Sequence, residues 1–487
     1  MTSPSLRARL FRTQPVPTGE QAESHGLKRS LGAFSLTMLG VGGTIGTGIF
    51  FTMAEAVPKA GPSVILSFLI AAFTAGLTAL CYAELAARIP ASGSSYSYVY
   101  ATLGEFLAYV VAACILLEYG LSASATAIGW SEYLNNFLQN AFGWQITEVL
   151  RTPMFVSGKD GLEIHWGHFN LPPILLVFLC GVLLMRGVRE SAAVNTTLVC
   201  IKILILIFFA AIALSGFHAE NFTPFFAGDP AKGQGGMTGV TAAAATVFFS
   251  FIGLDTVTTG GAEAKNPRRD VPLGIIAALV IVTVCYLLVA VTALGAQPAA
   301  KFEGQEAGLA VILQNVTGQV WPALILSAGA VISVFSVTFA SLFGQTRILY
   351  AISRDGLIGK SFQEVNSVTR VPTRNTIVVC LMAALVAGSV DSGYLWDMVS
   401  MGTLTAFAIV SAAVPVIRWR DAAEDKHKFQ VPFGPYFVPV LSILSCLYIM
   451  KDLSRTTYTV FGVWMAAALI GYFAYGMQNS RLQNAKP

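Results

Sequence analysis

The chain has 487 residues, of which 55% are hydrophobic and only 11% are charged, and its mean hydropathy is +0.66. Soluble domains carry roughly 25% charged residues, so this composition excludes a soluble protein and indicates one that lies in a membrane. The net charge of +4 implies no nucleic-acid partner, because the placement of charges in a membrane protein matters more than their sum.

Twelve apolar stretches, bounded by charged residues or by Pro and Gly clusters, predict membrane helices. A basic leader precedes the first stretch and has no clear cleavage site, so we expect the first span to be retained. The third and eighth stretches are long enough to tilt or to project beyond the bilayer. The predicted spans are 33–57, 62–87, 104–133, 170–186, 191–215, 238–259, 273–296, 319–350, 375–390, 394–417, 432–450 and 457–477.

The lysines and arginines predict the orientation of these spans. If the N-terminus is cytoplasmic, the inner segments hold 22 of the 30 basic residues and the outer segments hold 7, while Lys202 lies inside a span. Short cytoplasmic loops are enriched in Lys and Arg, and one missing span would place every later loop on the wrong side. We therefore expect both termini in the cytoplasm and a multi-pass protein of the plasma membrane, the inner membrane in a bacterium.

Glycines interrupt the first span in the stretch GVGGTIGTGIF, residues 40–50. Irregular backbone inside a bilayer is tolerated only where it lines a cavity or is buried in protein. Close helix packing through a G-x-x-x-G pair is the alternative explanation. However, Gly43, Gly46 and Gly48 are spaced more densely than a packing seam requires. The sequence therefore predicts a broken helix here.

The sixth span carries a second interruption at Gly253, within FSFIGLD, residues 249–255. The two interrupted spans are five apart, which is the offset between equivalent elements of two inverted five-helix repeats. We therefore expect an all-α integral membrane protein with twelve transmembrane helices, arranged as a LeuT-like 5+5 inverted repeat plus two extra helices. The expected parts are a cytoplasmic N-terminal segment (1–30), the first repeat (31–218), the second repeat (219–420), and the last two spans with a cytoplasmic C-terminus (421–487).

Each break leaves main-chain N–H and C=O groups free at the ends of half-helices, and these ends carry partial positive and negative charge. An α-amino acid offers a carboxylate and an ammonium on one carbon, so it matches both ends. Phe249 can also cover the site as a gate, or simply pack as an aromatic residue. The candidate carboxylate-binding N–H groups lie near Thr44, Ile45, Thr47 and Gly48, and the candidate ammonium-binding carbonyls are those of Phe249, Ser250 and Ile252.

Three ionisable residues lie deep inside predicted spans. Lys202 is about 11 residues into the fifth span, roughly 16 Å deep. A buried lysine can lose its proton when its surroundings change, which suits proton coupling, although a structural salt bridge is the alternative. Glu118 and Asp255 are the acids available to pair with Lys202, bind substrate or stabilise the unwound region.

The remaining residue types do not favour an enzyme. All seven cysteines fall within predicted spans without C-x-x-C spacing, which is typical of apolar packing, and the five histidines lie in loops. A membrane enzyme needs a nucleophile–base pair or a metal cluster inside a span. We therefore expect no catalytic residue, no metal and no cofactor.

Several motifs, in order, resemble the amino acid–polyamine–organocation (APC) superfamily. Across residues 26–478 the chain is most similar to bacterial relatives of the cationic amino acid transporters. The motifs are GTIGTGIF (43–50), YAELA (82–86), FSFIGLD (249–255), EAKNPR (263–268) and QTR (345–347). The resemblance implies a LeuT-like fold, alternating access, and coupling to protons rather than sodium. It also places Lys202 where sodium-coupled relatives hold an ion.

The resemblance further places Glu118 and Ser341 near the side-chain end of the substrate. A residue as small as Ser341 permits a long cationic side chain but does not demand one, so cationic and small neutral amino acids both remain open. The expected function is proton-coupled uptake of an L-amino acid. An exchanger or uniporter of the same fold is the alternative, and a channel or a nutrient sensor is the alternative from another class.

Overall fold

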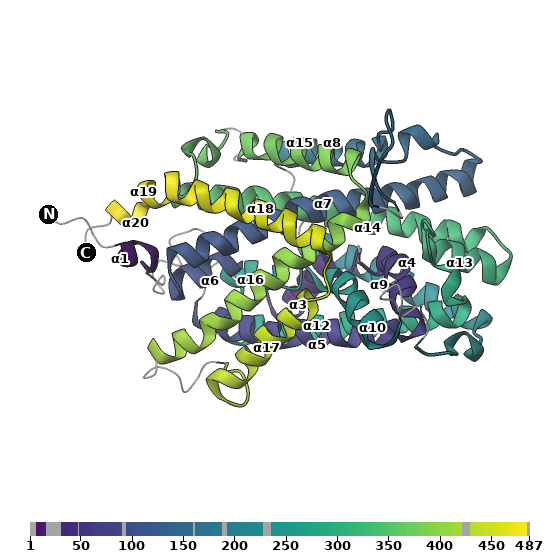
Figure 1. The fold of residues 1–487 in the computed structure, drawn as a ribbon, viewed down its shortest axis with the longest axis horizontal. Coiled ribbons are helices and arrows are strands. Elements are labelled where there is room, and N and C mark those ends of the chain that lie inside the picture. Colours follow the sequence, from purple (N-terminus) through teal and green to yellow (C-terminus); the bar gives the residue numbers. More distant parts are fainter. Residues whose placement is uncertain are drawn as a thin grey trace.

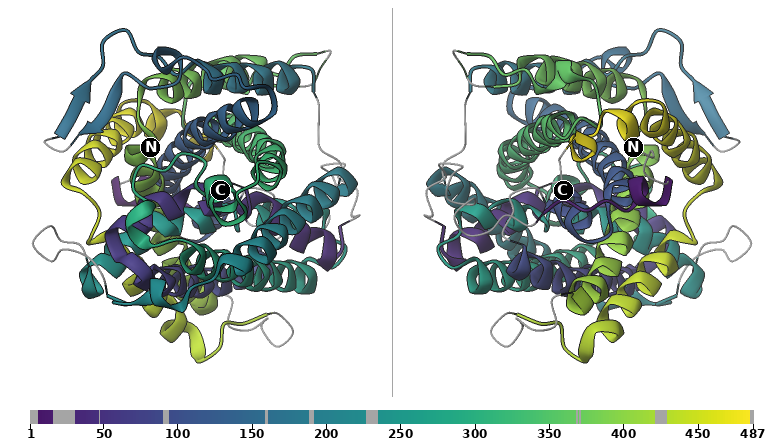
Figure 2. Two further views of the ribbon diagram at one scale, coloured as in Figure 1. Left: turned by 90° about the vertical axis from the view of Figure 1, so that its right-hand side faces the viewer. Right: turned by 90° about the vertical axis from the view of Figure 1, so that its left-hand side faces the viewer.

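The computed structural model describes residues 6–15, 31–46, 48–89, 94–158, 161–187, 192–226, 235–367, 369, 371–420 and 429–484. Long helices run roughly along one axis of the molecule (Figure 1) and form a bundle when viewed end-on (Figure 2). The only sheet among these residues is an antiparallel hairpin of β1 (Phe155–Gly158) and β2 (Gly161–Ile164). The described part of the chain is therefore all-α apart from one hairpin.

The helices fall into long elements of the bundle and short connecting ones. In chain order they are α1 (Leu6–Leu10), α3 (Ala33–Thr44), α4 (Gly48–Ala60), α5 (Val64–Arg88), α6 (Ser94–Thr102), α7 (Glu105–Phe142), α8 (Leu171–Met185), α9 (Ala192–Ala213), α10 (Gly236–Phe248), α11 (Thr256–Thr259), α12 (Pro267–Ala296), α13 (Gly308–Thr317), α14 (Trp321–Arg354), α15 (Thr373–Ser389), α16 (Ser392–Arg420), α17 (Gly434–Met450), α18 (Arg455–Gly471), α19 (Met477–Asn479) and α20 (Arg481–Asn484).

Helix covers most of each of the twelve predicted stretches, and two of those stretches contain breaks. Among the described residues, eight helical segments are long and apolar enough to cross a bilayer, with α4 and α5 counted as one segment, and α3, α8, α13, α15 and α17 are shorter apolar helices. The chain is thus a multi-pass helical membrane protein. The third and eighth stretches became the longest helices of the bundle, α7 with 38 residues and α14 with 34.

Local sequence explains several helix ends. Two prolines, Pro172 and Pro173, lie in the first turn of α8, where an N–H is not needed. Helix α7 ends at Phe142 and is capped by Gly143, whose φ of +68° is a left-handed conformation that glycine adopts without steric cost. The Ser454 side chain accepts a hydrogen bond from the Thr457 N–H and caps the start of α18.

The interior of the bundle forms around α7, which packs against α14 and α16. Helix α12 packs against α3 and α5, and α10 packs against α4 and α5. Both halves of the interrupted first span are therefore enclosed by other helices. Helices α8 and α15 pack together at the periphery, at the top of Figure 1.

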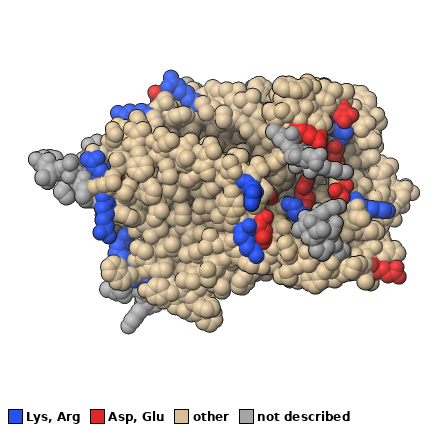
Figure 3. Space-filling model, viewed as in Figure 1, with Lys and Arg blue, Asp and Glu red and all other residues tan. Residues whose placement is uncertain are grey.

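Charge is distributed unevenly between the two ends of the bundle. Helices α1, α6 and α20 lie at the left end of Figure 1, and α13 lies at the right end. In the same orientation the charged atoms along the left edge are almost all from Lys and Arg, whereas acidic side chains gather toward the right end (Figure 3). The two ends of the molecule therefore present different electrostatic surfaces.

Candidate functional site

The first apolar span is interrupted between α3 and α4. Helix α3 ends at Thr44, Ile45 is extended with φ −78° and ψ 110°, and α4 begins at Gly48. Thr47 lies outside the described residues. The chain therefore leaves helical geometry deep inside the bundle, in the glycine-rich stretch of the first span.

A second interruption lies between α10 and α11. Helix α10 ends at Phe248 and is followed by a short 3-10 helix, η6 (Phe249–Phe251). Ile252 is extended, and Gly253 has a φ of +93°, which an L-residue with a side chain adopts only under strain. The second interruption thus depends on the glycine at position 253.

The two interruptions lie directly against each other. A Cβ atom added to Gly253 would overlap the carbonyl oxygen of Gly43, and one added to Gly48 would overlap Ser250. A Cβ on Gly46 would overlap Val337 of α14. The predicted break residues are therefore brought together in one place, and their lack of side chains permits the close approach.

Lys202 of α9 lies at the C-terminal end of α3. Its side chain is only 1% exposed, and its Nζ donates a hydrogen bond of 3.0 Å to the carbonyl oxygen of Gly42. The C-terminus of a helix carries partial negative charge from its free carbonyl groups, so an ammonium is stabilised there. A Cβ on Gly46 would lie 3.4 Å from the same Nζ. The lysine therefore hydrogen-bonds the α3 side of the first break and lies near Gly46 on the other side.

Tyr286 of α12 links the two interruptions through one hydroxyl group. Its Oη lies 2.8 Å from the carbonyl oxygen of Thr44 and 2.8 Å from that of Ser250, and the side chain is fully buried. A phenol has one proton, so the two carbonyls share a single donor. The ring makes an edge contact with Phe251, at 5.4 Å between centroids, which helps to hold the hydroxyl in place.

Tyr286→Phe is expected to lower the free energy of unfolding by about 1–3 kcal/mol, because it leaves two buried carbonyls without their shared donor. The measurement is thermal unfolding of the purified protein in detergent. Tyr458→Phe is the matched control, since Tyr458 also donates to a carbonyl, that of Met450 at 2.7 Å, but is exposed. The control should change stability by less than about 0.5 kcal/mol. An equal loss of stability in Tyr286→Phe and Tyr458→Phe would contradict a special role for the shared hydroxyl of Tyr286.

Aromatic side chains lie beside the second break. Phe249 packs edge-on against Trp396 of α16, with ring centroids 4.3 Å apart. Phe51 also stacks on Trp396, with ring centroids 6.2 Å apart, and Tyr133 contacts Phe51 edge-on at 5.4 Å. Phe249 is thus part of an aromatic layer formed by Phe51, Tyr133, Phe249 and Trp396.

The predicted acids and Ser341 are also buried near the breaks. Glu118 of α7 is buried within electrostatic range of Asp255, which follows Gly253. Ser341 lies on α14, one helical turn beyond Val337, so it shares the face of α14 that meets Gly46. These positions surround the interrupted segments from the side of α7 and α14.

Hydrogen bonds within the protein limit which main-chain groups are available to a ligand. The N–H of Ile45 donates to the carbonyl of Val41 at 2.7 Å, and Thr44 still belongs to the last turn of α3. The N–H of Ile252 similarly donates to the carbonyl of Phe249 at 3.1 Å. Since the first N–H groups of a helix have no intrahelical partner, the first turn of α4 from Gly48 onward is the better candidate for binding a carboxylate.

Two residues near the breaks were missed by reasoning from sequence, Tyr286 and Trp396. Each is a residue with one polar hydrogen inside a long apolar stretch. Buried Tyr and Trp usually find a hydrogen-bond partner, so Tyr286 offered a signal that could have been used. Nothing in the sequence indicates that Trp396 meets Phe249, because they are 147 positions apart.

A cavity lies elsewhere in the bundle, at one end of α8, α14 and α15. It shares no residue with the interrupted segments, and its lining residues are Leu184, Gly187, Phe343, Thr346, Arg347, Val371 and Thr376.

Comparison with known proteins identifies the class. The sequence matches the family described as "Amino acid permease" over residues 31–475. The chain therefore belongs to the amino acid permease family of the APC superfamily. The proteins of this family are transporters. This membership agrees with the resemblance seen in the sequence motifs.

Among its relatives, the chain is 39% identical to the methylthioribose transporter of Bacillus subtilis, covering 97% of this chain and 99% of that protein. It is 38% identical to the branched-chain amino acid permease BcaP of B. subtilis, over 94% of this chain and 95% of the relative. It is also 35% identical to the vacuolar cationic amino acid transporter 4 of Arabidopsis thaliana, over 81% of this chain and 64% of the relative.

Proposed function

We propose that this protein is a proton-coupled transporter that takes up an L-amino acid by alternating access. The observation that carries the proposal is the contact between two interrupted helices, where Gly43 meets Gly253 and Gly48 meets Ser250. Free N–H groups at the start of α4 suit a carboxylate, and carbonyl oxygens around η6, each able to accept a second hydrogen bond, suit an ammonium. Both groups are present on the same carbon of every α-amino acid.

The proposed membrane arrangement is twelve spans with a 5+5 inverted repeat. The interrupted helices are five spans apart in the predicted order, as equivalent elements of such a repeat would be. The basic end of the bundle, which carries α1 and α20, would face the cytoplasm under the positive-inside rule (Figure 3). This arrangement puts both termini inside, in the plasma membrane or the bacterial inner membrane.

Lys202 is the proposed proton carrier. Its ammonium, when charged, holds the C-terminal end of α3 through Gly42. Loss of its proton would remove a positive charge from a negative helix end and weaken that contact. Protonation of Lys202 would thereby be linked to the position of the first broken helix. Asp255 and Glu118 are the acids available to exchange or balance that charge.

The names of the relatives support an amino acid substrate but do not indicate which side chain that substrate carries. Two of them are named for branched-chain and cationic amino acids. Main-chain recognition would be common to both classes, and Ser341 would leave room at the side-chain end. Small neutral, branched-chain and cationic amino acids are therefore the first substrates to test.

Ser341→Met is expected to narrow selectivity toward small substrates. The longer side chain would fill space beside the interrupted segments and favour small over bulky competitors by about tenfold or more, as overpacking typically costs 1–3 kcal/mol. Competition by all twenty amino acids and ornithine against one labelled substrate measures the ranking. Ser341→Ala keeps the space open, so this variant should rank the competitors as the wild-type protein does. The same ranking in all three proteins would place Ser341 away from the substrate.

Reconstituted proteoliposomes test the function itself. A proton-coupled importer should accumulate labelled amino acid against its gradient when the interior is alkaline. An exchanger should require amino acid inside, and a uniporter or a channel should only equilibrate the label. A nutrient sensor should bind without flux. Accumulation that is indifferent to the pH gradient would contradict proton coupling.

A second candidate substrate comes from the 39% identity to a methylthioribose transporter along nearly the whole length of both chains. Methylthioribose is a thio-sugar without a carboxylate or an ammonium, so it would not use the charged complementarity proposed above. Including it in the binding panel separates the two candidates. Protection from thermal unfolding by methylthioribose and by no amino acid would favour this second function.

A further inference from the structure

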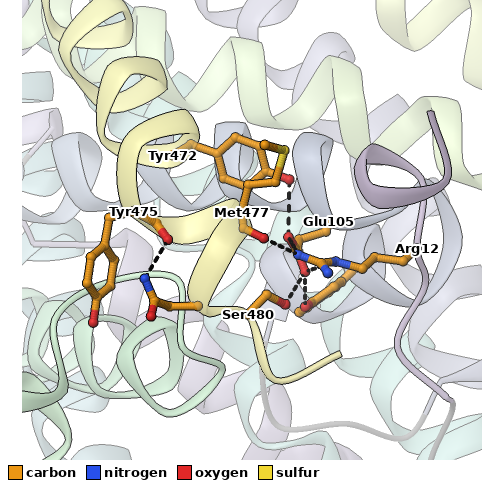
Figure 4. Close-up of polar contacts among 8 residues, drawn as sticks. Arg12, Glu105, Tyr472, Tyr475, Met477 and Ser480 are labelled. Atoms are coloured by element: carbon orange, nitrogen blue, oxygen red, sulfur yellow. Dashed lines mark hydrogen bonds and ion pairs between the residues drawn. The ribbon is translucent and has the colours of Figure 1, made fainter. Parts of the chain in front are cut away.

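A buried carboxylate joins the two terminal segments of the chain. Glu105, at the start of α7, is fully buried and accepts hydrogen bonds from residues in four parts of the sequence (Figure 4). The Arg12 guanidinium donates to both of its oxygens, at 2.7 and 2.5 Å. Its other donors are the hydroxyls of Tyr100 at 2.9 Å, Tyr472 at 3.1 Å and Ser480.

Main-chain contacts hold the N-terminal segment in the same place. The N–H of Glu105 donates to the carbonyl of Arg12 at 3.0 Å, and the N–H of Gln14 donates to that of Tyr100 at 3.1 Å. Arg12 also donates to the carbonyl of Met477 at 3.0 Å. Gly104, with a φ of +101°, lets the backbone of Phe11 approach so closely that a Cβ would not fit. The segment is thus built into the end of the bundle.

Helix α6 connects this cluster to the second break. Tyr100 lies on α6, and this helix packs against α11, which contains the buried Thr258. The Thr258 hydroxyl in turn donates to the carbonyl of Asp255 at 2.6 Å. A continuous set of buried contacts therefore runs from Arg12 to the half-helix that follows Gly253.

The C-terminal segment also contacts residues that hold α6. Tyr96 of α6 donates to the Asp355 carboxylate at 2.8 Å, and the main-chain N–H of Arg481 donates to the Asp355 carbonyl at 3.0 Å. Gly356 passes so close to the carbonyl of Asn479 that a side chain would not fit. Both terminal segments therefore contact residues that hold α6.

We propose that the two terminal segments form a latch that holds α6, and through it α11, in the position seen here. Removing one partner from a buried ion pair leaves an uncompensated charge, so loss of Arg12 would destabilise the whole cluster around Glu105. Release of Arg12 then frees the α11 side of the second break to move. The structural part of this inference needs no substrate, whereas its consequence for transport rests on the proposed function.

Hydrogen exchange of the full-length protein in detergent, followed by mass spectrometry, tests the latch. In Arg12→Ala we expect amides of α6 and of residues 253–264 to exchange about tenfold faster or more, because a buried charge has lost its partner. Arg151→Ala is the matched control, since Arg151 pairs with Glu306, whose side chain is half exposed. The control should leave α6 and 253–264 unchanged.

Faster exchange confined to residues 6–15 and 472–484 would overturn the proposal. It would show that the cluster around Glu105 holds the terminal segments in place without affecting the second break. Tyr472→Phe provides a milder variant that keeps the ion pair, in case Arg12→Ala does not fold. It should accelerate exchange in the same two regions by a smaller factor, and unchanged exchange in α6 and α11 would likewise overturn the proposal. Amino acid uptake by wild-type proteoliposomes tests the proposed function separately, so either idea can fail alone.

Discussion

Gly48→Ala is expected to reduce amino acid binding by about tenfold to a hundredfold. Alanine is normally the better residue in a helix by about 1 kcal/mol, so the α4 helix itself should not suffer. The added Cβ, however, would overlap the side chain and backbone of Ser250. The two interrupted segments would have to move apart, at a cost of about 1–3 kcal/mol typical of overpacking. Thermal stabilisation by the best substrate of the panel measures the loss.

Gly462→Ala is the matched control for this substitution. Gly462 lies in α18, and a Cβ at this position would have no atom within 4 Å. The control should bind the substrate with wild-type affinity and should be as stable as wild type or slightly more stable. Unchanged binding by Gly48→Ala would show that the contact between the two breaks does not shape the site.

Lys202→Ala is expected to abolish accumulation driven by a proton gradient. The substitution removes a buried lysine about midway along a predicted span, together with the hydrogen bond that holds the carbonyl of Gly42. The negative end of α3 would lose its cation, and the carrier would lose its proposed proton-binding group. Uptake into proteoliposomes with an alkaline interior measures the effect.

Lys451→Ala removes a lysine of similar charge from an exposed position, where it lies over the ring of Tyr448. This control should keep accumulation within about twofold of wild type, as surface substitutions usually have small effects. Accumulation by Lys202→Ala equal to that of the control would exclude a coupling role for Lys202. Binding of the substrate by Lys202→Ala without accumulation would separate coupling from recognition.

The helical architecture could be predicted because a bilayer permits few backbone arrangements. Apolar length, Pro and Gly boundaries and basic loops are local properties, and each predicted stretch contains a helix. The breaks were also visible, because a run such as Gly43 to Gly48 has no simple use in a continuous helix. The structure interrupts the chain at these places, and Gly253 takes the left-handed φ that only glycine adopts freely.

Contacts between distant parts of the chain could not be predicted in the same way. Tyr286 meets two carbonyls, of Thr44 and Ser250, that are far from it and from each other in sequence. Glu105 lies at the edge of a predicted span, and its burial by both terminal segments depends on how the whole bundle packs together. Such contacts follow from tertiary packing rather than from any local pattern.

The most direct test of the central claim compares a free amino acid with the same molecule after its charged groups are blocked. The measurement is thermal stabilisation of the wild-type protein by the best substrate, by its methyl ester and by its N-acetyl derivative. If main-chain groups of the two broken helices bind the carboxylate and the ammonium, each blocked derivative should lose at least about tenfold in affinity. Equal stabilisation by all three compounds would contradict this account of the site.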